Sequence, residues 1–131
     1  MEKIISRLED RLNRLDAEYS DFRYVEVEKI RIRTKDGKLE EVKESYSCGI
    51  GFRVLKGGAF GFSATGNLDE KFLGAHLEQA YRMAKRFSKI RHTEVKLTPL
   101  QPVRDRWEMP VDRDPWKISL KEKTDPLFEA E

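Results

Sequence analysis

The sequence has one cysteine, Cys48, and two histidines, and it contains no apolar run of the length that crosses a membrane. One cysteine excludes an internal disulfide and suits a reducing compartment. The first residues lead into an amphipathic pattern rather than a signal peptide, so we expect a cytoplasmic protein. The 26 basic and 24 acidic residues nearly cancel and are interleaved, which argues against a general nucleic-acid surface. The 131 residues suffice for one domain with its own core.

The sequence also has few residues that could bind a metal or act as a nucleophile. It contains no HExxH, CxxC, Walker A or GxSxG motif. His76 and His92 are isolated from other ligand residues, and we interpret both as surface or boundary histidines, because a zinc site needs several protein ligands. Cys48 falls in the apolar phase of its predicted strand. We therefore interpret it as a small buried side chain, and a small enzyme that uses Cys48 is the weakest alternative.

The most informative stretch present is SCGIGFRVLKGGAFGFSATGNLD, residues 47–69. Apolar residues alternate along it, a Gly57-Gly58 pair interrupts the alternation, and the alternation then resumes. This order predicts a strand, a tight turn and a second strand with one continuous buried phase. Asn67 and Glu70 predict a capping box at the start of a helix. The alternating residues are Cys48, Ile50, Phe52 and Val54 before the turn, and Phe60, Phe62 and Ala64 after it.

Residues 22–34 are also typical of a strand. Val25 and Val27 have the opposite phase to Ile30 and Ile32, which predicts a bulge or break near residues 28–29. Asp36-Gly37 then indicates a two-residue hairpin. The return strand begins at about residue 38, and Val42 already has the phase of Cys48. We therefore expect an antiparallel meander of four strands.

Two amphipathic helices are predicted, at about residues 2–18 and 68–88, each with apolar residues at helical spacing. We expect them to cover the apolar face of the sheet. The predicted fold class is thus α+β: an antiparallel β-meander packed against two amphipathic helices, followed by an extended, proline-containing C-terminal segment.

That C-terminal segment, residues 99–131, is expected to be a tail or linker outside the main domain of residues 1–98. Its prolines prevent a continuous helix. Ser119 and Glu122 form a second capping-box pattern, but we expect Pro126 to stop that helix after barely two turns. Trp107 and Trp116 are either core or interface residues, and the sequence leaves both interpretations open.

Several segments together resemble the N-terminal domain of the TldD/PmbA family, also called the modulator of DNA gyrase family. The segments are YVEVE, IRIRTKDGKLEEV, GIGFRVLKGGAFGFSATGNLD and DPWKISLKEK, with Ala80, Ala84 and Lys85 between them. The resemblance covers nearly the whole chain. It implies a longer zinc metallopeptidase with an HExxxH motif and a Cys ligand beyond this domain, which itself forms one wall of the substrate cleft. It also implies homo- or heterodimers that process peptides.

No metal ligand can be assigned to this chain from the resemblance, so zinc is expected only in the catalytic part of longer family members. We expect a non-catalytic N-terminal domain or truncated homologue, with peptide or protein substrates and TldD/PmbA-type subunits as partners, and with neither nucleic acid nor membrane. The alternative is a stand-alone protein-interaction module, and an HExxxH-coding extension of the gene would discriminate the two. The candidate substrate-binding residues are Gly49, Gly51, Arg53, Gly58, Gly61 and Phe62.

Overall fold

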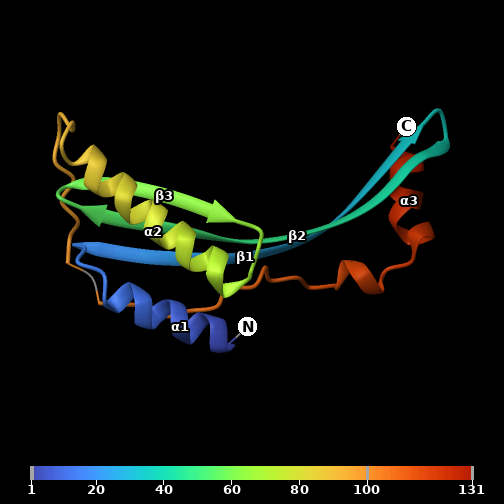
Figure 1. Ribbon diagram of the computed structural model, residues 1–131. Helices are drawn as coiled ribbons and strands as arrows, with labels where there is room; N and C mark the ends of the chain where they lie inside the picture. The colour runs from blue at the N-terminus through green and yellow to red at the C-terminus, as the bar shows by residue number, and fades with distance from the viewer. Residues whose placement is uncertain (1, 100, 131) are drawn as a thin grey trace. The chain divides into compact units, whose positions relative to one another are not determined.

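The computed structural model describes residues 2–99 and 101–130 (Figure 1). Its strands form one sheet in the order β1-β2-β3, and β2 and β3 are antiparallel, which confirms the α+β class. No helix of the described residues is long and apolar enough to span a membrane. In chain order the elements are α1 (Glu2–Asn13), β1 (Tyr19–Lys35), β2 (Lys38–Lys56), β3 (Ala59–Thr65), α2 (Glu70–Phe87), the 3-10 turn η1 (Pro115–Lys117) and α3 (Leu120–Glu129).

Contacts divide the chain into two compact units. The first unit comprises Met1–Val27 and Ser47–Thr98, and the second comprises Glu28–Tyr46 and Pro99–Glu131. The strands β1 and β2 contribute residues to both units. Each unit is therefore described by itself below.

The core of the first unit lies between one face of the sheet and the helices α1 and α2 (Figure 1). Alternate residues of β2 are buried, and in α2 the buried residues recur at helical spacing, as expected when a helix packs on a sheet. Partly buried Phe22 and Tyr24 of β1 extend this layer. The buried residues of this core are Leu8, Ile50, Phe52, Val54, Leu73, Leu77, Ala80 and Ala84.

The predicted strands differ from the observed ones in number and phase. Residues 38–56 form one strand of 19 residues, so the sheet has three strands rather than four. The strand β1 is unbroken, because its partly buried positions from Phe22 to Thr34 carry even numbers, and Val25 and Val27 are exposed. Val42 is exposed as well, which corrects its predicted burial.

The phase of β3 is also corrected. The two-residue turn pairs Val54 with Gly61, so an even buried position in β2 lies opposite an odd position in β3. Phe60, Phe62 and Ala64 therefore lie on the face away from the helices, and Phe62 is 56% exposed.

The helix α1 ends at Asn13, earlier than predicted, whereas α2 confirms the second predicted helix to within two residues at its start and one at its end. The prediction that Asn67 and Glu70 form a capping box is wrong. Asp69 is the N-cap and makes no side-chain cap bond, while the side-chain oxygen of Asn67 accepts a hydrogen bond from the Asp69 amide at 2.9 Å. The carboxylate of Glu70 instead pairs with Arg7 and Arg11 of α1, which ties the start of α2 to the middle and the last turn of α1.

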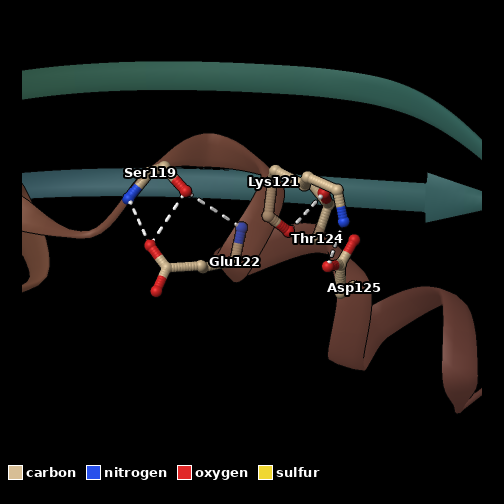
Figure 2. Close-up of polar contacts among 5 residues, drawn as sticks. All are labelled: Ser119, Lys121, Glu122, Thr124 and Asp125. Carbon is tan, nitrogen blue, oxygen red and sulfur yellow. Dashed lines mark hydrogen bonds and ion pairs between the residues drawn. The ribbon is translucent and has the colours of Figure 1, made fainter.

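In the second unit, the predicted capping box at the start of α3 is confirmed (Figure 2). The Ser119 hydroxyl oxygen accepts a hydrogen bond from the Glu122 amide at 3.3 Å, and the Glu122 carboxylate accepts one from the Ser119 amide at 3.2 Å. The helix nevertheless continues through Pro126, which corrects the predicted stop. Capping and the burial of Thr124 hold the first turns, so the backbone bond lost at Pro126 does not end the helix.

The two tryptophans of this segment lie at its surface. Trp107 is 76% exposed and Trp116 is 43% exposed, so neither belongs to a packed core in the described chain. Trp116 contacts two neighbours. The Asp114 side chain accepts a hydrogen bond from the Trp116 amide, and Lys123 Nζ lies 6.0 Å from the centroid of the Trp116 ring.

Candidate functional site

The candidate site is the face of the sheet that the helices leave uncovered in the first unit. Directly opposite residues of an antiparallel pair project to the same face, so the pairs Gly51–Ala64 and Arg53–Phe62 lie on it together. Further toward the turn, the pair Leu55–Phe60 lies on the same side, and there Leu55 is buried and Phe60 is half-buried. We call this surface the open face.

A shallow groove of about 400 Å³ lies on the open face, with glycine as its floor. A Cβ at Gly51 would have only the Ala64 Cβ nearby, at 4.0 Å, so there is room above this residue. A Cβ at Gly49 would lie 3.1 Å from the Thr65 carbonyl oxygen, so this glycine serves the close approach of two strands. The lining residues are Arg23, Val25, Gly49, Ile50, Gly51, Ala64, Thr65 and Gly66.

Arg53 stands beside the groove in a fixed arrangement. Its guanidinium donates to both carboxylate oxygens of Asp21, from Nε at 3.2 Å and from Nη2 at 2.6 Å, and Nη2 also donates to the Tyr19 hydroxyl at 3.1 Å. The hydrogen bonds to Asp21 are the main cause that raises the pKa of the Arg53 guanidinium. Arg53 is therefore a neutralised, oriented side chain, with donors left on Nη1 for a further acceptor.

Aromatic rings frame this guanidinium. Its central carbon lies 5.4 Å from the centre of the Tyr19 ring and 5.7 Å from that of Phe60, both within cation–π range. Phe60 and Phe62 in turn lie with their ring centroids 5.7 Å apart. The open face thus places exposed Phe62 and half-buried Phe60 next to the glycine groove. Gly49, Gly51, Arg53 and Phe62 are the predicted residues that it brings together.

Gly58 lies outside this group, in the turn between β2 and β3. Gly57 and Gly58 both have positive φ, at 58° and 69°, as a type I′ hairpin turn requires. The Glu18 carboxylate accepts hydrogen bonds from both turn amides, at 2.5 and 3.2 Å, and the Gly58 carbonyl accepts one from the Val95 amide at 2.9 Å. The amides that could hold an anionic ligand are thus already bound to a carboxylate of the same chain.

Gly61 also lies apart from the group, on the buried side of β3. A Cβ there would overlap the Ala80 carbonyl oxygen and the Ala84 amide of α2. This glycine therefore allows the helix backbone to rest directly on the strand, and it does not contact the groove.

The sequence interpretation missed a polar contact between β3 and α2. The Ser63 hydroxyl lies 2.6 Å from His76 Nδ1 and donates to the Gln79 side-chain oxygen at 3.2 Å. The i, i+3 spacing of His76 and Gln79 and the odd position of Ser63 could have indicated it. No carboxylate completes a catalytic triad in these contacts, so we assign them to the joint between strand and helix.

Among residues 2–99 and 101–130, no three His, Cys, Asp or Glu side chains converge in a way that could hold a metal ion. Cys48 is half-buried rather than fully enclosed. The open face offers apolar contact, guanidinium hydrogen bonds and close approach over glycine.

The first unit is a two-layer α+β arrangement whose sheet has one open, glycine-floored face. The family model for PmbA/TldA metallopeptidase domain 1 matches residues 20–88, which include β1, β2, β3 and α2. The chain belongs to this family.

The relatives are longer proteins. A metalloprotease of Methanocaldococcus jannaschii is 27% identical over 113 residues, which are 86% of this chain and 25% of the relative. A metalloprotease of Methanothermobacter thermautotrophicus is 31% identical over 127 residues, which are 97% of this chain and 26% of the relative. The chain thus spans about a quarter of the length of these relatives.

Two solved structures share the fold. A Thermotoga maritima protein described as a modulator of a DNA gyrase matches 98% of this chain and 28% of its own, with a TM-score of 0.63 and 22% identity. TldE from Thermococcus kodakarensis matches 96% of this chain and 28% of its own, with a TM-score of 0.59 and 15% identity.

Proposed function

We propose that this chain is a non-catalytic domain that binds extended peptide segments and takes part in assembly in a TldD/PmbA-type metallopeptidase. The observation that carries the proposal is the open face, where the Gly51 floor adjoins the exposed ring of Phe62 and the oriented guanidinium of Arg53. Family membership supports a role in proteolysis, since the relatives are named metalloproteases. A reducing cytoplasmic setting agrees with the single cysteine.

The groove suits an extended main chain for a physical reason. A glycine floor lets a second backbone come into van der Waals contact with the sheet, which a larger side chain would prevent. Phe60 and Phe62 offer apolar area to alternate side chains of such a segment, and Arg53 Nη1 offers donors to a carbonyl or carboxylate. Binding of this kind selects for extended conformation more than for sequence.

The test is peptide binding by the purified chain, measured by fluorescence anisotropy with a pool of labelled, unstructured peptides of about ten residues. We expect Gly51→Ala to bind like the unsubstituted chain, because its Cβ has room. Gly51→Phe fills the groove, and we expect it to weaken binding at least about tenfold while the circular dichroism spectrum is retained. Equal binding by both variants, or no binding by the unsubstituted chain, would contradict the proposal.

The same proposal holds that this chain supplies no metal centre. Elemental analysis of the purified chain is expected to show well under one zinc per chain, because zinc is held by several converging side chains. About one tightly held zinc per chain would show instead that the domain has a metal site of its own.

A further inference from the structure

Residues 103–111 carry a pattern typical of a strand but form no strand in the described chain. Apolar side chains occupy four of the five odd positions, and charged residues and proline occupy the even ones, which is close to the period of two of a half-buried strand; Asp105 is the exception. The exposed fractions are 82% for Val103, 76% for Trp107, 71% for Met109 and 56% for Val111. A run of large apolar side chains this exposed indicates a surface that another element covers.

The sheet has two outer edges, β1 with 17 residues and β3 with 7, and the edge of β3 is the one close to this segment in length. The strand order places β3 at an edge of the described sheet. Lys56 and Ala59 flank a two-residue turn and are the hydrogen-bonded pair that closes the hairpin, so the bonds to β2 come from odd residues of β3. The backbone groups of Phe60, Phe62 and Ala64 therefore point outward at the edge, and their side chains lie on the open face.

We propose that residues 103–111 of one chain add as an antiparallel strand to the outer edge of β3 in a second copy. The two lengths match, since β3 has 7 residues, from Ala59 to Thr65. In antiparallel pairing, hydrogen-bonded partners share a face, so the apolar odd residues of the segment would lie beside Phe60 and Phe62. The proposal deepens the assembly role given above and rests on it.

The prolines fix the orientation of the segment. Pro102 and Pro110 occupy even positions, so the odd residues can turn their amides toward β3 while the prolines face the outer side. The odd residues also carry the apolar side chains that would lie on the open face. Hydrogen bonding and side-chain packing therefore require the same orientation of the segment. Proline on the new outer edge would also block the addition of a third chain.

A second copy is the partner that this geometry favours because one chain carries both halves of the contact. Two copies can exchange segments around a twofold axis, which forms the contact twice and closes the assembly. The net charge of +2 offers little repulsion between copies. Doubling the contact also raises the buried area toward the 1,200–2,000 Å² that is roughly usual for a stable interface.

Two matched proline variants test whether the odd-numbered residues of the segment donate the hydrogen bonds to β3. Asp105 and Arg106 are adjacent, exposed and polar, and their substitution removes the same local hydrogen bond between the Asp105 carboxylate and the Arg106 amide. Asp105→Pro deletes an amide that should bond to β3, whereas Arg106→Pro deletes one that should face outward. By sedimentation velocity over a concentration series, we expect Asp105→Pro to raise the dimer dissociation constant at least about tenfold, and Arg106→Pro to change it less than about threefold.

Cross-linking tests which copy supplies the segment. In a Cys48→Ala background, a chain with Ala64→Cys is mixed with a second chain that carries one cysteine at each position from 105 to 109 in turn. A disulfide between the two chains is expected at the one odd position that lies opposite Ala64 and at no even position, because hydrogen-bonded pairs bring Cα atoms to about 5.5 Å.

The proposal is overturned if the unsubstituted chain sediments as a monomer throughout, if the two proline variants behave alike, or if the disulfides ignore parity. A variant with both cysteines in one chain distinguishes another outcome: a cross-link that forms only within that chain means that the segment covers its own β3. Failure of peptide binding at Gly51 would leave the sedimentation result unchanged, so the two proposals fail separately.

Discussion

Gly61 and Gly51 give a matched pair of substitutions, because the same added carbon meets opposite surroundings on the two faces of the sheet. At Gly61 a Cβ would overlap backbone atoms of Ala80 and Ala84 in α2, and a helix backbone cannot yield as a flexible side chain does. At Gly51 the nearest atom is the Ala64 Cβ, at 4.0 Å, which is ordinary contact. We therefore expect Gly61→Ala to be strongly destabilising and Gly51→Ala to be neutral or slightly stabilising.

The size of the destabilisation by Gly61→Ala follows from the packing that α2 loses. Overpacking a core costs about 1–3 kcal/mol, and we expect at least the upper value here because the contact is with backbone. Moving the helix outward also loosens the packing of Leu73 and Leu77, which are buried in the same layer. Against a total of about 5–15 kcal/mol for a domain, this is a large share. Gly51→Ala removes backbone freedom from the unfolded chain and should gain up to about 1 kcal/mol.

The assay is urea denaturation followed by far-ultraviolet circular dichroism, which reports on the helices. A loss of about 3 kcal/mol lowers the midpoint by about 1–3 M urea at the usual dependence on denaturant. A Gly61→Ala midpoint within about 0.3 M of the unsubstituted chain would refute the reasoning that α2 rests directly on β3.

Three further predictions follow from the polar contacts. The hydrogen bond from Arg113, with those of the capping box, lowers the pKa of Glu122 from 4.5 to about 2, so its contribution to α3 is present above pH 4.5 and lost as the pH falls toward 2; hydrogen exchange of α3 should show this loss, and Glu122→Gln should remove the pH dependence. Arg53→Lys cannot keep the bidentate pair with Asp21, and thermal denaturation should show a loss of about 1 kcal/mol; an unchanged midpoint would mean that the pair is not maintained in solution. Glu18→Ala leaves the turn amides to water and should cost about 1 kcal/mol in the same assay, whereas Glu18→Gln should recover part of it by accepting one of the two bonds.

Features set by local sequence could be predicted. The helix at 70–87 and both glycine-containing turns follow from short-range periodicity and turn chemistry, and Ser119 and Glu122 lie close enough to specify their own cap. The end of α3 could not be predicted in this way. The clash that Pro126 introduces is a local cost, whereas the burial of Thr124 is a matter of tertiary packing, which a local pattern does not specify.

The phase errors have a common cause. In β1 and β3 apolar residues occupy both faces, so hydrophobic alternation alone does not identify the buried side. The turn does identify it: a two-residue loop after Lys56 fixes Val54 opposite Gly61 and transfers burial to the odd residues of β3. The sequence named Gly49, Gly51, Arg53 and Phe62 as candidates but could not show that they share one surface. Gly61 could be separated from Gly51 only once register was considered.

The two hairpin turns have the same backbone conformation but differ in what holds them. Asp36 and Gly37 have positive φ, like Gly57 and Gly58, yet a Cβ at Gly37 would meet no atom within 4 Å. The Gly57-Gly58 turn is bound by Glu18 on one side and by Val95 on the other. Residues inserted between Gly57 and Gly58 would have to displace both of these partners. A reporter or a foreign loop fused at this turn would therefore loosen the hairpin of β2 and β3.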